Sequence, residues 1–577
     1  MADTTKRLSR VLTDLHHGGR AVAGADLGVA DAATNDKVAL NYVVENPEPP
    51  LEEISTPFNY LFGDLKDDYP DNHLPVEPSS AVVTALKALG SAMVDAPPDG
   101  DPNSTIPPVY TYWGQFLDHD ITANTDRNDV IGIEGDPLTP IEPFLVPGTL
   151  RNLREPALNL DSVYGNGPDA PHDTDDKEVP YDGIELRVGD LTVLGAPIFA
   201  AVPGADLPRV TANGKARIGD SRNDENLIVA QLHLAFLRFH NKAVEWVRTN
   251  QPEITGDDAV FARARELTRW HYQWIVVHDF LRRIAKGSVV DELLANPVAD
   301  KITQTRPDGT TEVFMPLEHS VAAYRFGHSM VRAAYDHNEN FGRPLTGDDP
   351  DPLNPNRATF EQEFQFTGNN VIQGDGAEPT EFAFKTLPDN WPIRWTRFTD
   401  ADKPDRVARK IDTHLAPPLK DLTNEGNVDE NGDPVPVRES RILKRLAVRN
   451  LLRGYRLGIP TGQAVASALG VTPLTEEDLL SGDQGVMDAL IDGGFVDATP
   501  LWFYVLKEAE VQENGERLGE VGSRIVCTTI IGQVQADPGS FLNASGGWTV
   551  ANGVKLSNGG GEVGTIKAFL QFAGVQI

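Results

Sequence analysis

The stretch that decides the fold reads Trp113-Gly114-Gln115-Phe116-Leu117-Asp118-His119-Asp120. It places a glutamine, a histidine and two carboxylates within about two turns of an otherwise apolar helix. Gln115 lies four residues before His119, so both side chains can face one cavity. Because buried polar groups need partners, this pattern predicts a ligand for the polar face. The plainer alternative is a structural histidine paired with a carboxylate.

The composition predicts a folded and strongly acidic protein. Of the 577 residues, 40% are hydrophobic, which is enough for a substantial core, and the net charge is −34. A surface of this charge repels nucleic acids and anionic lipids, so neither is an expected partner. No apolar run reaches the roughly 20 residues of a membrane span, and no signal peptide is visible. We expect a soluble protein, with secretion, a cytoplasmic location and the oligomeric state all left open.

Helical periodicity dominates the chain. It predicts helices over 109–119, 224–249, 258–285, 316–335, 438–454, 461–469, 475–491, 498–508 and 519–533. Residues 1–55 are polar and mixed, which predicts an N-terminal extension, while clusters of Pro, Asp and Gly predict loops over 56–110. Strand-like alternation is rare and short, as at Glu185-Leu186-Arg187-Val188. We expect a mainly α fold, with one large domain over 56–577, long irregular loops and few short strands.

Two later segments carry further polar groups on apolar helices. One reads Gly219-Asp220-Ser221-Arg222-Asn223-Asp224-Glu225-Asn226 and opens a long apolar helix. Its acidic residues could simply cap exposed N–H groups and suit the helix dipole. The other reads Tyr324-Arg325-Phe326-Gly327-His328-Ser329-Met330, where the plain interpretation is a satisfied core histidine.

A fourth segment is strongly basic. It reads Leu446-Ala447-Val448-Arg449-Asn450-Leu451-Leu452-Arg453-Gly454-Tyr455-Arg456-Leu457-Gly458-Ile459-Pro460. Taken alone, it is a cationic amphipathic helix that Gly458 and Pro460 end. We give this segment weight because it follows the other three segments along the chain.

The four segments, in this order and with these internal spacings, resemble the animal-type haem peroxidases of the peroxidase–cyclooxygenase superfamily, in particular a bacterial-like member. The resemblance runs from about residue 56 to the region of Ser540. It implies a haem peroxidase domain over 56–577 that binds haem b. The implied activity is reduction of H₂O₂ through an oxyferryl intermediate, coupled to oxidation of a halide, thiocyanate or a small organic or aromatic donor.

The resemblance also implies roles for individual residues on the distal side of the haem. His119 matches the distal acid–base, which takes a proton from one peroxide oxygen and returns it to the other. Arg222 matches the distal arginine, whose charge stabilises the departing oxygen. Gln115 matches a residue that holds water or a halide near the iron. Asp118 and Glu225 match carboxylates that form ester bonds to haem methyl groups.

On the proximal side, His328 matches the axial iron ligand. Gly327 would let the helix approach the macrocycle, and Arg325 could pair with a haem propionate. Asn450 has the spacing of an asparagine that accepts a hydrogen bond from the axial imidazole, which raises the reduction potential of the iron. Myeloperoxidase-like members carry a methionine where this chain has Asn226, so no sulfonium bond can form here. We therefore expect bromide, iodide, thiocyanate or organic donors rather than chloride.

A calcium site is a further implication of the resemblance. Asp120 matches a family ligand, and a later loop should supply the remaining oxygen ligands that a hard cation needs. The matching positions of that loop are Glu155, Ala157 through its carbonyl, Asn159 and Asp161. Glu155 stands where a threonine is usual, and Asn159 where an aspartate is usual. A hydrogen-bonded loop without a cation is the alternative.

Other functions remain possible at this stage. The superfamily also contains haem-dependent fatty-acid dioxygenases, in which a tyrosine lies three residues before the proximal histidine, but this chain has Arg325 there. A non-catalytic haem or adhesion scaffold would not need His119, Arg222, His328 and Asn450 together. A zinc site is disfavoured because no zinc-type His cluster occurs, and His233 and His240 are expected to be packing residues. The single cysteine, Cys527, excludes an intrachain disulfide and is expected to be buried.

Overall fold

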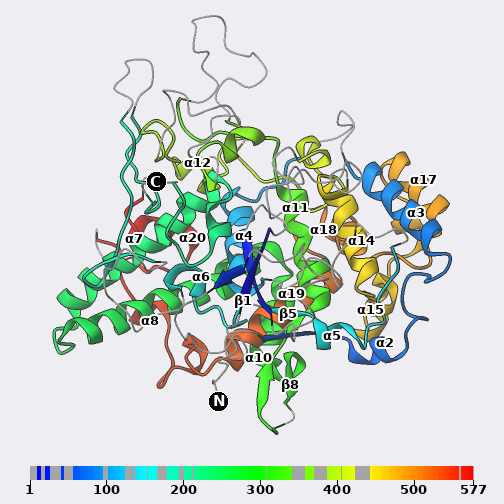
Figure 1. The fold of residues 1–577 in the computed structure, drawn as a ribbon, viewed down its shortest axis with the longest axis horizontal. Helices are drawn as coiled ribbons and strands as arrows, with labels where there is room; N and C mark the ends of the chain where they lie inside the picture. The colour runs from blue at the N-terminus through cyan, green and yellow to red at the C-terminus, as the bar shows by residue number, and fades with distance from the viewer. Residues whose placement is uncertain are drawn as a thin grey trace, which may run out of the picture.

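The computed structural model describes residues 9–14, 20–25, 41–43, 56–94, 102–123, 133, 138–152, 154–165, 179–193, 201–210, 214–306, 308–340, 358–368, 386–404, 406–422, 442–557 and 561–575. Helices dominate this part of the chain and the strands are few and short, as predicted (Figure 1). No described helix has the length and apolar character needed to cross a membrane.

The longer helices are α3 (Ser79–Ala92), α4 (Val109–Ile121), α7 (Leu227–Asn250), α8 (Asp257–Ile275), α10 (Gly287–Ala295), α14 (Leu446–Arg456), α15 (Gly462–Ala468), α17 (Gln484–Gly493), α18 (Leu501–Glu513), α19 (Glu520–Ala536) and α20 (Ile566–Phe572). The short helical segments are α2 (Gly63–Asp67), α5 (Val146–Thr149), α6 (Asp161–Tyr164), η1 (Ser221–Asp224), η2 (Val276–Phe280), α9 (Leu281–Ile284), η3 (Ala299–Ile302), η4 (Glu318–Ala322), η5 (Ala323–Phe326), α11 (Gly327–Met330), η6 (Phe360–Phe364), α12 (Thr396–Thr399), η8 (Pro417–Lys420), α16 (Glu476–Leu479), η9 (Phe541–Asn543) and η10 (Val550–Asn552).

The strands form small sheets only. They are β1 (Ser9–Asp14), β2 (Arg20–Ala25), β3 (Asn41–Val43), β4 (Thr56–Asn59), β5 (Arg151–Asn152), β6 (Tyr181–Asp182), β7 (Glu185–Leu186), β8 (Thr303–Thr305), β9 (Thr311–Val313), β10 (Met315–Pro316), β11 (Ala334–Tyr335) and β12 (Ala358–Thr359). β4 pairs with β10 in parallel and with β5 antiparallel. The first three strands pair in the order β2-β1-β3, within the segment predicted as an extension. The division at residue 55 stays a prediction.

Aromatic packing places α4 near the centre of the fold (Figure 1). The ring of Phe116 on α4 stacks on Phe236 of α7, with centroids 4.2 Å apart. Trp113 meets Phe569 of α20 edge-on at 5.4 Å, and Tyr272 of α8 contacts both α4 rings. Because these rings are fully buried, they fix how far α4 can rotate. The opposite, polar face of α4 is thereby directed away from the aromatic cluster.

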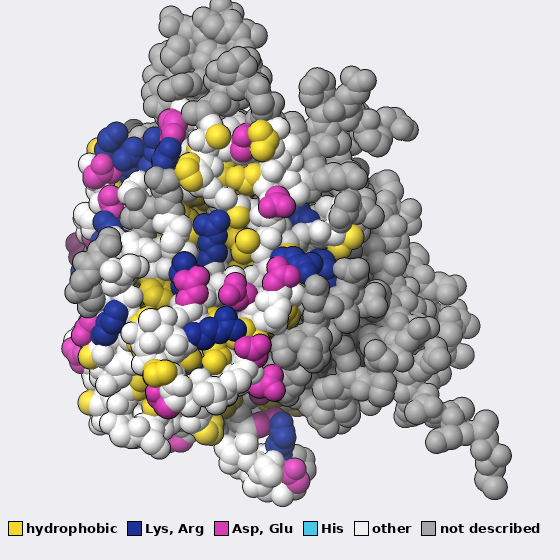
Figure 2. Space-filling model, turned by 90° about the vertical axis from the view of Figure 1, so that its left-hand side faces the viewer, with side chains coloured by type: hydrophobic (Ala, Val, Ile, Leu, Met, Phe, Trp, Pro, Cys, Tyr) yellow, Lys and Arg dark blue, Asp and Glu magenta, His cyan; other side chains and the backbone are white. Residues whose placement is uncertain are grey.

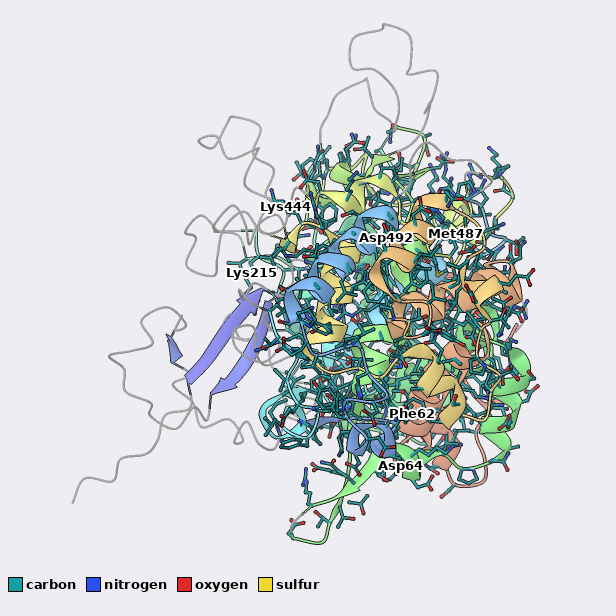
Figure 3. All side chains as sticks on the ribbon, turned by 90° about the vertical axis from the view of Figure 1, so that its right-hand side faces the viewer. Phe62, Asp64, Lys215, Lys444, Met487 and Asp492 are labelled. Carbon is teal, nitrogen blue, oxygen red and sulfur yellow. The ribbon has the colours of Figure 1, made fainter. Side chains whose placement is uncertain are left out.

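A second group of helices packs on the other side of α4 (Figure 1). It contains α14, α18, α19, α3 and α17, with α14 and α17 both packed against α3. On α17, Val486 and Leu490 are buried at a spacing of four residues while Asp492 is exposed, as an amphipathic helix requires. Figure 3 shows Met487 and Asp492 on this helix. Cys527 on α19 is buried and free, as predicted.

The predicted helix over 316–335 is wrong, because this segment is broken into short pieces. It passes from β10 through η4, a turn of π-helix, and η5, a turn of 3₁₀-helix, into the single α-turn of α11. Changes in helix type of this kind mark strain or a functional hinge. Their consequence is that His328 lies on a short turn at the cavity described below.

Three other expectations need correction. The segment 56–110, predicted as loops, contains the 14-residue helix α3. The predicted helix over 475–491 is two helices, α16 and α17, which separate around Gly482, where φ is +88°. The predicted helix over 258–285 includes one turn of π-helix, η2, between α8 and α9. In each case a helix boundary depends on local turns that hydrophobic periodicity does not report.

Charged side chains are mixed rather than segregated on the face that Figure 2 presents. Acidic and basic groups lie side by side there, with apolar side chains between them. The large negative net charge is therefore not gathered into one patch on the described part of this face.

Candidate functional site

A cavity lies between α4, the start of α7 and the segment that carries His328. The space inside it that the centre of a water molecule can reach is about 130 Å³. Aromatic and aliphatic side chains such as Phe280, Phe360 and Leu446 form most of its wall. The polar side chains that converge on it are Gln115, Asp118, Glu225, Asn226, Arg325, His328, Glu363 and Arg449. A large, mainly apolar ligand with a few polar groups would suit this space.

Three predicted distal residues face the cavity together. Gln115 and Asp118, one turn apart on α4, both line it, as does Glu225 from the start of α7. The Gln115 amide nitrogen donates to a Glu225 carboxylate oxygen. Asn226 donates to Gln115 Oε1 at 3.3 Å and also caps α7 by accepting from Val229 N at 3.0 Å. The carboxylates of Asp118, on α4, and of Glu225, between η1 and α7, therefore both line the cavity.

His119 is fully buried next to this wall and is not among the residues that line the cavity. Its Nδ1 lies 2.9 Å from Asn223 Oδ1, and Asn223 Nδ2 lies 3.0 Å from His233 Nδ1. Since an amide oxygen only accepts, His119 Nδ1 carries the proton and Nε2 keeps its lone pair. Burial, together with the nearby Arg222, lowers the pKa of His119 to about 3. The imidazole is therefore neutral and can act as a base.

Arg222 lies beside His119 and is also outside the cavity lining. Its Nη2 donates to the His119 carbonyl at 2.8 Å and to Asp220 Oδ2 at 2.7 Å. Arg154 also binds Asp220. Although burial raises the pKa of Asp220, these two guanidinium groups hold it well below its usual range. Arg222 is thus fixed by a buried carboxylate that stays ionised.

The proximal group is built from α11 and α14. His328 is buried on α11, with its Nδ1 2.9 Å from Asn450 Nδ2 on α14, while Arg325 Nη1 donates to Asn450 Oδ1 at 3.3 Å. The amide nitrogen of Asn450 thus faces the His328 ring, whereas the sequence predicted the amide oxygen there. A 180° rotation of the Asn450 amide would exchange the nitrogen and the oxygen. Burial, with Arg325 and Arg449 nearby, lowers the pKa of His328 well below its usual value. A neutral imidazole is the form that binds a metal ion.

The cavity leaves room for a planar group beside His328. A Cβ added to Gly327 would meet no atom within 4 Å, and Gly327 lines the cavity. Burial lowers the pKa of Arg325 to about 10, so this side chain is still a cation at neutral pH. The His328 imidazole, the Arg325 cation and the carboxylates of Asp118 and Glu225 all line this cavity, and these groups fit the haem predicted from the sequence.

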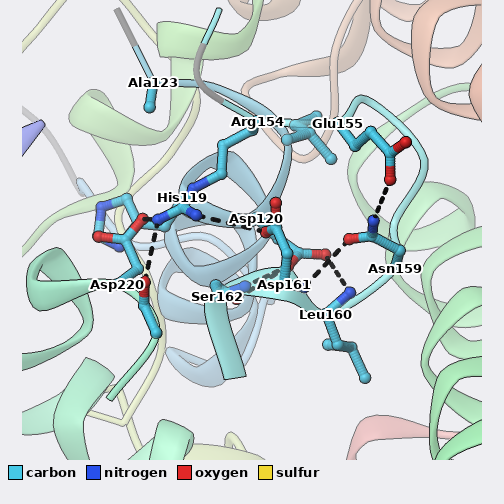
Figure 4. Close-up of polar contacts among 12 residues, drawn as sticks. His119, Asp120, Ala123, Arg154, Glu155, Asn159, Leu160, Asp161, Ser162 and Asp220 are labelled. Carbon is cyan, nitrogen blue, oxygen red and sulfur yellow. Dashed lines mark hydrogen bonds and ion pairs between the residues drawn. The ribbon is translucent and has the colours of Figure 1, made fainter. Parts of the chain in front are cut away.

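The predicted calcium ligands are close together, but protein groups already occupy them (Figure 4). Asp120 accepts from Ser162 Oγ at 2.8 Å and from Leu160 N at 3.3 Å. Asp161 lies 3.7 Å from the Arg154 guanidinium. In the described ranges, no group of three or more His, Cys, Asp or Glu side chains could hold a metal ion.

The other predicted ligands of that loop also have protein partners. Glu155 accepts from Asn159 Nδ2 at 2.6 Å, and Asn159 Oδ1 accepts from Asp161 N at 3.0 Å. The Ala157 carbonyl accepts from Gln273 Nε2 at 3.3 Å. These contacts make a hydrogen-bonded loop, and the donor set does not fit a calcium ion.

Sequence reasoning missed the residues that hold the predicted ones. Asp220 and Asn223 fix Arg222 and His119, and both stood in the quoted segment, where they were interpreted as helix caps. Asp220 does cap η1, through Arg222 N at 2.9 Å, so the capping interpretation is correct but incomplete. Arg449 lines the cavity; its position next to Asn450 was the available signal. The two histidines expected to pack do so, as His240 lies 2.9 Å from Tyr164 Oη.

Comparison with known protein families finds a match for part of this chain. Residues 199–379 match the model of the animal haem peroxidase family. This range includes the Arg222–Asn226 and Arg325–His328 segments, while α4 and α14 lie outside it.

The curated relatives are distant and longer. A peroxidase-like protein from Margaritifera margaritifera is 26% identical over 272 residues, which cover 41% of this chain and 33% of that protein. Peroxidase mlt-7 from Caenorhabditis elegans is 22% identical over 318 residues, covering 49% of this chain and 40% of the relative. This chain thus spans well under half the length of these relatives.

Solved structures give alignments that cover most of the chain. Peroxidase A from Dictyostelium discoideum has 15% identity and a TM-score of 0.48, covering 85% of this chain and 88% of that one. Fatty acid alpha-dioxygenase from Oryza sativa has 12% identity and a TM-score of 0.49, covering 85% and 76%. The animal haem peroxidase family is thus the one that residues 199–379 match, and the two curated relatives given above carry the name peroxidase.

Proposed function

We propose that this protein is a haem peroxidase that reduces H₂O₂ and oxidises bromide, iodide, thiocyanate or small organic donors. The observation that best supports it is the arrangement of the cavity. The cavity is lined by His328, whose ring is paired with Asn450, and also by Gln115, Asp118 and Glu225. A scaffold without catalysis would have no need of these polar groups around one cavity.

In this proposal the cavity would hold the haem, and His328 would bind its iron. When bound, haem supplies the iron at which peroxide is reduced. Arg325 and Arg449, both on the cavity wall, pair with the propionates. Asp118 and Glu225 would form ester bonds to the macrocycle, and in support of this both carboxylates line the cavity.

The distal residues handle protons and charge. His119, neutral with its Nδ1–H directed to Asn223, accepts a proton from one peroxide oxygen at Nε2 and donates it to the other. Arg222 stabilises the negative charge that develops on the departing oxygen. Neither side chain lines the cavity, so both roles require peroxide to reach them from it. Gln115 holds water or a halide at the cavity wall.

Fatty-acid dioxygenation is the second candidate, because Tyr324 lines the cavity. Its hydroxyl donates to the Gly114 carbonyl at 3.2 Å, and its ring stacks on His319 with centroids 4.7 Å apart. The position three residues before His328 is held by Arg325 instead. Peroxidase chemistry is therefore the better supported of the two.

The direct test is a visible spectrum of the full chain reconstituted with haem, before and after one equivalent of H₂O₂. We expect a Soret band that shifts within seconds and returns when bromide, iodide, thiocyanate or a phenol is added. Chloride should restore it poorly at neutral pH, because Asn226 cannot form the electron-withdrawing sulfonium bond. Efficient chloride oxidation would refute the donor preference. Absence of a Soret band after reconstitution would refute the peroxidase itself.

The ester bonds are tested separately by extraction. After incubation with H₂O₂, acid–acetone should leave haem attached to the wild-type protein. Removing one carboxylate, in Asp118→Asn or Glu225→Gln, should leave a single link, and the double variant should release all the haem. Complete extraction from the peroxide-treated wild type would rule out covalent attachment while leaving haem binding untouched.

A further inference from the structure

Arg154 is a buried cation in the middle of the loop that was expected to bind calcium. Its side chain is 15% exposed. One guanidinium nitrogen lies 3.7 Å from Asp161 of that loop, and another binds Asp220 and donates to the Gly219 carbonyl at 3.4 Å. Figure 4 shows Arg154 between Asp220 on one side and the Asp120–Asp161 pair on the other.

These contacts join two segments that are far apart in sequence. Arg154 belongs to the loop before α6, whereas Asp220 begins η1 and holds Arg222. Arg222 in turn donates to the backbone of His119 at 2.8 Å. A continuous chain of ion pairs and hydrogen bonds therefore runs from the loop to both predicted distal residues.

The same loop offers poor coordination to a metal ion. Calcium takes six to eight oxygen ligands at about 2.3–2.6 Å. Here the Asp120 carboxylate accepts from Ser162 and from the Leu160 backbone, and Glu155 is turned to Asn159. A guanidinium, which cannot be deprotonated in proteins, already lies among these acidic groups, beside Asp161 and Asp220.

We propose that the guanidinium of Arg154 takes the place of a bound calcium ion in this protein. It pairs with Asp220, lies 3.7 Å from Asp161 and joins the 154–165 loop to the segment that carries Arg222. The protein accordingly requires no calcium for its stability. The proposal concerns the fold and does not depend on bound haem or on peroxidase activity.

The first test uses the wild-type full chain. We expect metal analysis after dialysis to find no calcium above background, and the unfolding temperature to be the same in excess calcium and in excess chelator. A stoichiometric calcium ion, or an unfolding temperature that falls with chelator, would overturn the proposal. This measurement needs no variant, so it is decisive even if substitutions at Arg154 prevent folding.

The second test removes the cation. In Arg154→Ala, Asp161 and Asp220 lose their shared partner in a buried setting, so we expect the unfolding temperature to fall by roughly 5 °C or more. Adding millimolar calcium should recover part of that loss in the variant and change nothing in the wild type. Arg248→Ala is the matched control, because Arg248 forms an exposed pair with Asp257 and should shift the temperature by about 1 °C or less. A variant as stable as the wild type would contradict the proposal.

Discussion

The His328→Ala variant is expected to lose haem while keeping its fold. His328 is the imidazole on the cavity wall that Asn450 orients, and its depressed pKa keeps it available as a ligand. Without it, and before peroxide has formed any ester bond, the cofactor would be held only by apolar contacts and by pairs to Arg325 and Arg449. The change removes no aromatic ring from the α4–α7 packing, so the secondary structure should be unchanged.

The measurement is haem content after reconstitution and gel filtration, read from the Soret absorbance and a haem assay. We expect most of the haem to be lost in the variant, and exogenous imidazole to restore part of it by entering the vacated space. His278→Ala is a suitable control, since His278 on η2 contacts Trp274 and is not on the cavity wall. Full haem retention by His328→Ala would assign the axial ligand elsewhere.

The Arg222→Ala variant should bind haem normally and react with peroxide far more slowly. Loss of one fixed donor to a developing oxyanion typically costs ~10²–10³ in rate. The structure predicts that the fold survives this change, because Asp220 keeps Arg154 as its partner. Arg222→Lys keeps the positive charge but lacks the planar guanidinium. Its rate of reaction with peroxide should lie between those of the wild type and Arg222→Ala.

Stopped-flow mixing with H₂O₂ gives the rate constant directly, with Arg248→Ala as the surface control.

The pH dependence of this rate constant separates the role of Arg222 from that of His119. Since the pKa of His119 is lowered to about 3, the neutral base is present above that pH and is lost only as the pH falls through it. The wild-type rate constant should therefore stay level from neutral pH into mild acid. A rate constant unaffected by Arg222→Ala would remove this residue from the mechanism.

The sequence predicted the elements whose apolar residues recur with helical period. α4 begins at Val109 as predicted and extends two residues beyond the expected end. α7 and α19 also match within a few residues. The segment around His328 could not be predicted, because its apolar pattern suits a helix while the backbone changes helix type twice. α3 was missed because prolines and acidic turns flank it on both sides.

In the candidate site, too, the sequence could predict some positions and not others. Residues that share one helical turn, such as Gln115 and Asp118, could be placed on one face from spacing alone. The partners of His119 could not, since Asn223 and Arg222 reach it across 104 and 103 residues. Asp220 binds Arg222 from two residues away, within a local turn. Arg154 is the clearest case: nothing in its local sequence indicates that it binds a carboxylate 66 positions away.

The π-turn η2 has a consequence for how this chain is aligned with others. A turn of π-helix holds one residue more than a turn of α-helix, and here it brings Phe280 against Gly114 and the Asp279 carboxylate to Tyr110 at 2.7 Å. A relative whose corresponding helix is regular must be given a gap inside that helix. Without it, every position from Leu281 onward is matched to a residue about 100° away around the axis. Homology-based comparison of the cavity wall then equates inward-facing residues with outward-facing ones.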